Sequence, residues 1–376
     1  MKSYLDLVPQ YEKVHRKQSK MSRICIILAV FLVAVMFGLA DMYLQGITQK
    51  VMQENGDWHY QITSIDTKTS DIIAARPEVE VSGWHSTISA DAGYSISGQP
   101  IAISGLDEDV FGEIYLASLA EGKYPNAANE IAVSSVLKES NDLDLGSVID
   151  LTCPDGSTVS FSIVGFFDNP EKARLIAGSE QSVILAQEGF TTFISASNSP
   201  ASEKYIIQLS QHCDMSSTIE KIKSQYSLSD GQIEANMNLL NIEGQLAGKT
   251  GVNQIYSIAL ILSIIVMLTC ILMISSTLNS NVTQRTEFFG MLRCLGATKK
   301  QIMNFVRLEG LYWCKTAIPA GVALSIVVVW VTSAAMRKIG PQWFAYMPTW
   351  GISWISIAVS VSLVETEESC CTLHGS

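Results

Sequence analysis

The sequence predicts an α-helical membrane protein with one large mixed α+β domain outside the bilayer. Four apolar stretches divide the 376 residues unevenly, and three of them lie in the C-terminal third. A helix needs roughly 20 apolar residues to cross about 30 Å of hydrocarbon. About two hundred mostly polar residues separate the first stretch from the second. A segment of that length can bury a core of its own, and basic residues flank the membrane stretches.

Each apolar stretch is predicted to be a transmembrane helix. The four predicted helices cover residues 24–44, 252–278, 311–336 and 350–364. The first follows 23 residues and lacks a small-x-small cleavage site, so we expect a retained anchor instead of a signal peptide. The fourth is apolar over a run that spans only about 22 Å, short of the hydrocarbon thickness, and we expect a truncated helix there.

The charges beside these helices predict the topology. Residues 1–23 carry six basic and two acidic side chains, and basic side chains also outnumber acidic ones in residues 279–308. Lys and Arg near membrane ends stay cytoplasmic, so both segments are predicted to lie inside. The domain at 45–251 and the short loop at 337–349 then lie outside. Residues 41–252 hold 29 acidic and 11 basic side chains, which argues against nucleic-acid binding.

Within the external domain, alternating residues indicate strands and one turn indicates a hairpin. Residues 148–153 and 158–164 flank a Pro-Asp-Gly-Ser turn, the pattern of a β-hairpin. Further strands are predicted at 58–62, 94–103 and 204–209. A helix is predicted at 218–226, with a capping box formed by residues 217 and 220.

The sequence offers no catalytic, metal or cofactor site. The stretch GQLAGKT (residues 244–250) is one residue short of a phosphate-binding loop and lies before a helix on the outer side. The histidines lack metal-ligand spacing. Cys153 and Cys213 are the two external cysteines, and the sequence leaves open whether they are bonded. We therefore expect a non-catalytic chain.

The cytoplasmic segment after the second helix carries the most informative pattern. Phe288, Leu292 and Leu295 recur at helical spacing and form an apolar stripe, which predicts a short amphipathic helix at the inner membrane face. Gly296 is expected to end this helix in a left-handed conformation. Thr298 is then expected to cap a new helix, with Gln301 completing the box.

Two sets of motifs resemble known families. The run RTEFFGMLRCLGAT (residues 285–298) resembles the signature of FtsX-like permeases of ABC transporters. Outside the membrane, LAEGKYP (119–125), NEIAVS (129–134) and LGSVI (145–149) resemble the MacB-like periplasmic core domain. The order of helices and domain agrees with both families, and the resemblance covers most of residues 15–364.

The resemblance implies a function. In this family the segment after the second helix is a coupling helix that docks on a separate cytoplasmic ABC ATPase, which binds the ATP. The docking region then includes Arg285, Glu287, Arg293, Gly296, Ala297 and Lys299. The implied protein is a multi-pass efflux or export permease of the bacterial cytoplasmic membrane, acting by mechanotransmission. Its expected partners are the ATPase, a second copy or second permease, and membrane lipid.

Two other classes stay open at this point. An FtsX-type regulator would use the same ATPase to activate an extracellular cell-wall hydrolase without transporting a substrate. A receptor would signal inward, although no kinase, phosphatase or cyclase segment supports this. Residues 365–376 form an acidic tail where the family has a basic one. We expect a truncated or frame-altered end, or the first half of a double-length permease.

Overall fold

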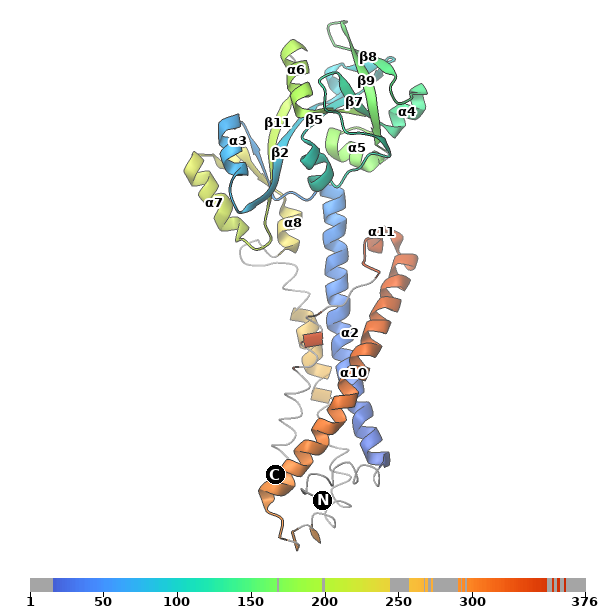
Figure 1. Cartoon of the computed structure of the whole chain (residues 1–376), viewed down its shortest axis with the longest axis vertical. Coiled ribbons are helices and arrows are strands. Elements are labelled where there is room, and N and C mark those ends of the chain that lie inside the picture. Colours follow the sequence, from blue (N-terminus) through green and yellow to red (C-terminus); the bar gives the residue numbers. More distant parts are fainter. Residues whose placement is uncertain are drawn as a thin grey trace. The chain divides into compact units, whose positions relative to one another are not determined.

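The structure is a computed structural model that divides the chain into two compact units (Figure 1). It describes residues 16–167, 169–197, 200–243, 257–266, 268, 269, 272, 290, 291, 293, 294, 296–349, 354, 357, 358 and 362. Residues Met1–Ile47 and Val252–Ser376 form one unit, which we call the helical unit. Residues Thr48–Gly251 form the other, which we call the sheet unit.

Two long helices dominate the described part of the helical unit. They are α2 (Arg16–Asn55) and α10 (Lys299–Ile339), and the short helix α11 (Pro341–Phe344) follows α10. By length and composition, Arg23–Asn55 and Tyr312–Ile339 can each cross a membrane. A shorter apolar helix covers Ser257–Val266, within the second predicted span. Most of the second and fourth predicted spans lies outside the described residues, so the count of four helices stays a prediction.

Both long helices exceed their predicted bounds. The first was expected to end at residue 44, but α2 continues to Asn55, because the chain offers no stop until Gly56 adopts a φ of 86°. The helix predicted to follow the Thr298 cap is α10, which begins at Lys299 and continues through Pro319 and the third predicted span to Ile339 without a break. The Thr298–Gln301 capping box that starts it is confirmed, with Gln301 N 3.4 Å from Thr298 Oγ1.

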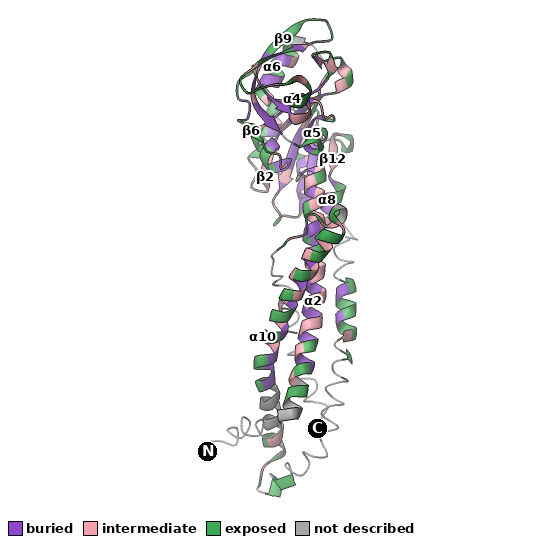
Figure 2. Cartoon of the chain, turned by 90° about the vertical axis from the view of Figure 1, so that its right-hand side faces the viewer, coloured by how far each residue is buried: buried purple, intermediate pink, exposed green. Residues whose placement is uncertain are grey.

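Apolar side chains of α2 and α10 pack against one another within the helical unit. Ile26 and Val30 of α2 pack with Trp313, Cys314 and Ala317 of α10. Buried positions form a stripe along each helix (Figure 2). The outward side of α10 carries large apolar residues that are about half exposed, namely Leu324, Val327 and Val331. Such a surface is suited to lipid.

The sheet unit is mixed α and β, as predicted. Its strands are β1 (Tyr60–Thr63), β2 (Val79–Ile88), β3 (Ser95–Ile96), β4 (Gln99–Pro100), β5 (Ala102–Leu106), β6 (Glu121–Gly122), β7 (Glu130–Ser134), β8 (Val148–Thr152), β9 (Thr158–Phe167), β10 (Ser182–Ala186), β11 (Ser202–Leu209) and β12 (Ile233–Ala235). Its helices are α3 (Thr67–Ala74), η2 (Ala90–Ala92), η3 (Val110–Ile114), α4 (Ser135–Asn141), α5 (Pro170–Ala177), α6 (Gln187–Ser197), α7 (Met215–Tyr226), η4 (Asp230–Gln232) and α8 (Met237–Ile242).

The strands described form one sheet in the order β12-β1-β11-β2-β5-β10-β7-β9-β8-β3-β4, with β6 paired to β9. The β5–β10 and β7–β9 pairs are parallel, and the other pairs are antiparallel. Alternate side chains of each strand face opposite sides of the sheet. Tyr205 and Ile207 of β11 pack with α3, α7 and α8, whereas Ile206 packs on the other face with η3 and α5. Helices α4 and α6 cover a separate cluster beside β7–β10.

Most predicted elements of the sheet unit are present, with two corrections. The hairpin of β8 and β9 and the strand at 204–209 are confirmed, and β1 overlaps the strand predicted at 58–62. The single strand predicted at 94–103 is wrong, because Ser97 and Gly98 both have positive φ and turn the chain between β3 and β4.

The other correction concerns the cap of α7. The helix begins at Met215, three residues before the predicted start, and Asp214 caps it by accepting from Ser217 N at 3.1 Å. The earlier start buries Met215 in the core. Cys153 and Cys213 are both free and belong to different hydrophobic clusters, which settles the alternative that the sequence left open.

Candidate functional site

The end of α2 is the point at which a candidate transmembrane helix becomes part of the sheet unit. The chain leaves the helix at Gly56, whose amide donates to Met52 O at 2.9 Å. A Cβ on Gly56 would lie 3.0 Å from the Trp58 ring and 3.2 Å from the Tyr115 ring. Glycine is therefore required both by the left-handed backbone and by the close packing.

A buried lysine holds this helix end from the side. Lys172 lies in the first turn of α5, which Asn169 caps, and its side chain is 5 % exposed. Its Nζ donates to Gln53 O of α2 at 2.8 Å and to Tyr115 O at 2.6 Å. Burial lowers the pKa of the Lys172 ammonium. The last turn of a helix carries carbonyls without helical partners, so a cation here satisfies and attracts them.

From Tyr115 the polar contacts continue to the face of the sheet. Tyr115 Oη lies 2.7 Å from His85 Nδ1, and His85 Nε2 lies 2.9 Å from Ile176 O. Because a carbonyl only accepts, Nε2 carries the proton and Nδ1 accepts from the tyrosine. Burial lowers the pKa of His85 to about 4, so the imidazole is neutral near pH 7. Helix α5 is thus linked to both α2 and β2.

A second buried histidine, His59, connects the first and the last segments of the chain within the sheet unit. His59 follows α2 by four residues, and Glu243 directly follows α8. His59 Nε2 lies 2.9 Å from Glu243 Oε2, and their side chains are 2 % and 11 % exposed. His59 Nδ1 accepts from Leu209 N at 2.8 Å.

Carboxylates gather around this histidine. Burial raises the pKa of the Asp57 carboxyl, and the charges of Glu243 and Glu80 raise it further. The Asp57 backbone amide donates to Ile114 O at 2.6 Å, which ties this segment to η3. The segment between α2 and β1 is therefore fixed by backbone and side-chain bonds together.

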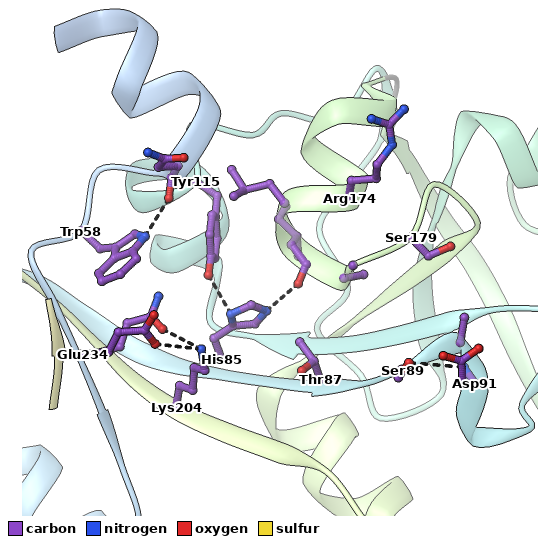
Figure 3. Close-up of a pocket in the computed structure, with 17 residues that line it drawn as sticks. Trp58, His85, Thr87, Ser89, Asp91, Tyr115, Arg174, Ser179, Lys204 and Glu234 are labelled. Carbon is purple, nitrogen blue, oxygen red and sulfur yellow. Dashed lines mark hydrogen bonds and ion pairs between the residues drawn. The ribbon is translucent and has the colours of Figure 1, made fainter. Parts of the chain in front are cut away.

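A cavity of about 630 Å³ lies beside the helix end, between α5 and the sheet. Trp58 and Tyr115 line one end of it, and Asp91 and Ser179 line the other (Figure 3). Its size is typical of small-molecule sites. Among its charged side chains, Lys204 contacts Gln61 and Glu234, and Arg174 contacts Glu180. This pairing favours a water-filled cleft over a preorganised ligand site.

The external motif residues have a structural explanation. Gly122 has a φ of 87°, and a Cβ there would lie 2.1 Å from Val164 O of the paired strand β9. Glu130 accepts from Asn126 N at 2.9 Å and from Ala127 N at 3.1 Å, and Lys123 Nζ donates to it at 3.0 Å. These bonds fasten the segment between β6 and β7.

The Glu130 bonds predict a pH dependence of stability. The amide of Asn126, the Lys123 side chain and the amide of Ala127 lower the pKa of Glu130 from its ordinary 4.5 to about 2. A depressed folded-state pKa stabilises the fold above the ordinary value, and the contribution is lost as the pH falls toward 2. Glu130→Gln is expected to flatten the loss of stability between pH 5 and 3, measured by urea unfolding. An unchanged slope beside a Glu139→Gln control would contradict this.

The predicted coupling residues are only partly described. Gly296 has a φ of 94°, as expected, Ala297 follows it, and Lys299 is the first residue of α10. Arg293 is exposed. Arg285, Glu287, Phe288, Leu292 and Leu295 lie outside the described residues.

Sequence reasoning missed the contacts at the end of α2. The Asn55–Gly56 pair was a readable helix stop. Nothing in the sequence paired Lys172 with Gln53 or His59 with Glu243, because these partners are 119 and 184 residues apart.

Two family models match the chain. One, described as MacB-like periplasmic core domain, matches residues 22–225, which is more than half of the chain. The other, described as FtsX-like permease C-terminal, matches residues 260–364. No curated protein sequence matches.

Solved structures are similar to the chain at low identity. The periplasmic region of MacB from Actinobacillus actinomycetemcomitans is 8 % identical, with a TM-score of 0.38, over 54 % of this chain and 100 % of that one. The extracellular domain of the ABC-type transporter YknZ from Gram-positive bacteria is 8 % identical, with a TM-score of 0.34, over 47 % of this chain and 98 % of that one. A domain of a permease protein from Porphyromonas gingivalis is 11 % identical, with a TM-score of 0.33, over 54 % of this chain and 97 % of that one.

Proposed function

This chain belongs to the family of membrane permeases that combine a MacB-like periplasmic core domain with an FtsX-like C-terminal region, and we propose that it is the membrane subunit of an ABC-type efflux or export system. The family implies a cytoplasmic ABC ATPase as partner and a permease that is not itself catalytic. We place the chain in the bacterial cytoplasmic membrane as a multi-pass protein.

One observation supports this proposal above the others. Helix α2 is unbroken from Arg16 to Asn55, and its last eight residues belong to the sheet unit. Its end is held by Lys172, by the Gly56 turn and by the bond from Asp57 N to Ile114 O. A continuous helix transmits a displacement along its axis better than a flexible linker does. Movement at the cytoplasmic end of α2 is therefore delivered to α5 and the sheet.

The proposed sequence of events begins on the cytoplasmic side. Closure of the ATPase on ATP pushes the amphipathic segment that contains Leu292 and Leu295. This segment precedes α10, which begins directly after the Thr298 cap, so the push reaches α10. The sheet unit then moves and changes the access of a substrate or adaptor outside the membrane. A second copy or a second permease completes the assembly.

The size of the external unit favours export over the regulator of a cell-wall hydrolase. The sheet unit covers Thr48–Gly251 and has its own hydrophobic clusters, whereas FtsX-type regulators usually carry a smaller external loop.

Reconstitution tests the proposed function. The neighbouring genes are searched for a Walker-motif ATPase, and the chain is placed in lipid nanodiscs with that protein. We expect a stable complex whose rate of ATP hydrolysis differs from that of the free ATPase. A neighbouring ATPase that neither binds nor changes its rate would refute the proposal.

Topology is a separate prediction. In a chain without Cys153 and Cys213, Asp155→Cys is expected to react with an impermeant maleimide in whole cells, because the β8–β9 turn is exposed and external. Lys300→Cys, exposed at the start of α10, is expected to react only after the cells are permeabilised. The reversed pattern would overturn the orientation and the position of the coupling segment.

A further inference from the structure

The pair His59 and Glu243 stands where both connections of the sheet unit meet. The chain enters this unit along α2, which ends four residues before His59, and it leaves after α8, whose last residue precedes Glu243. Residue Val252, where the helical unit resumes, is nine positions further on. Two connections that are distant in sequence are thus joined by the His59–Glu243 contact and by Asn236 Nδ2, which donates to Gly56 O at 3.4 Å.

The direction of the hydrogen bond between His59 and Glu243 is fixed by the other hydrogen bond that the His59 ring makes. Leu209 N is a donor, so His59 Nδ1 must accept, and Nε2–H then donates to Glu243. A hydrogen bond to a carboxylate is shorter and stronger than one between neutral groups. With side chains 2 % and 11 % exposed, water competes little for either partner. The ring has one hydrogen-bonded orientation, and that orientation needs both Leu209 and Glu243.

Backbone hydrogen bonds around the pair also link the segment after α2 to the segment that contains α8. His59 N donates to Ile207 O at 3.0 Å, and His59 O accepts from Asn236 N at 2.9 Å. Asn236 also caps α8, with Leu239 N 3.3 Å from its Oδ1. The start of α8 is therefore bonded to His59, and His59 is in turn bonded to β11. The contact from His59 to Glu243 adds the far end of α8 to this group.

We propose that His59 and Glu243 form a clasp that makes the two connections of the sheet unit move as one body. The inference rests on the proposed function, and it names the positioning residues through which motion is shared. With the clasp closed, a displacement of α2 carries the end of α8 with it, and the sheet moves rigidly. With the clasp open, the end of α8 separates from β11 and part of the displacement is lost there.

The experiment measures the distance between α2 and α8 in the intact chain in nanodiscs. Spin labels are attached at Gln49→Cys and Asn238→Cys, both exposed positions, in a background without other cysteines. Glu243→Leu is expected to broaden the distance distribution by several ångströms, because His59 loses its acceptor. Glu243→Gln keeps an acceptor oxygen and is expected to retain the narrow distribution. Glu220→Leu, at an exposed position of α7, is the matched control.

A second arm adds the ATPase with ATP and vanadate. The clasp predicts that the distance stays constant in the wild type and shifts in Glu243→Leu. Equal, narrow distributions in all variants would overturn the clasp, whether or not an ATPase binds. A wild-type chain that binds no ATPase would instead overturn the proposed function, and the widths without ATP would still decide whether the clasp exists.

Discussion

Leu295→Asp is expected to remove the cytoplasmic ATPase from the purified complex while the permease still inserts into the membrane. Leu295 belongs to the apolar stripe that includes Phe288 and Leu292 in the predicted coupling helix. Docking would bury the new carboxylate without a partner, at a cost of about 3 kcal/mol. That cost weakens binding more than a hundredfold. Co-purification on an affinity tag measures the loss.

Two further variants make this result specific. Leu292→Asp is expected to give the same loss, because it occupies the same stripe. Thr286→Asp adds the same charge about 160° around the helix from Phe288, and it is expected to retain the ATPase. Full ATPase recovery with both stripe variants would contradict the docking role of this segment.

Lys172→Met is expected to lower the free energy of unfolding of the sheet unit by roughly 3 kcal/mol. The substitution removes two hydrogen bonds from a charged donor, each worth about 1.5–3 kcal/mol, and leaves Gln53 O and Tyr115 O without that donor. Part of the loss is recovered because the buried ammonium no longer has to be desolvated. For a unit of this size the thermal midpoint falls by roughly 6–12 °C.

Thermal unfolding of the intact chain in detergent, followed by tryptophan fluorescence, measures this effect. Lys221→Met is the control, because it makes the same substitution at an exposed position of α7. Equal midpoints for the two variants would show that Lys172 does not anchor the end of α2. A selective loss would also predict weaker coupling of ATP hydrolysis to movement of the sheet unit.

Local patterns in the sequence predicted the elements whose cause is local. The apolar lengths gave the helical class, the Pro-Asp-Gly-Ser turn gave the β8–β9 hairpin, and Thr298 with Gln301 gave the start of α10. The errors were also local in origin. The Ser97–Gly98 turn was overlooked, and Asp214 caps α7 in place of Ser217.

The sequence alone therefore determined the class of protein and its family, since each depends on neighbouring residues, and the segment that meets the ATPase stays a prediction. Only the tertiary structure showed that α2 is fastened by Lys172, and that His59 meets Glu243. These contacts join residues far apart in the chain. They depend on which face of the sheet each strand presents and on where α5 and α8 pack, and a linear pattern of residue types does not encode such pairings.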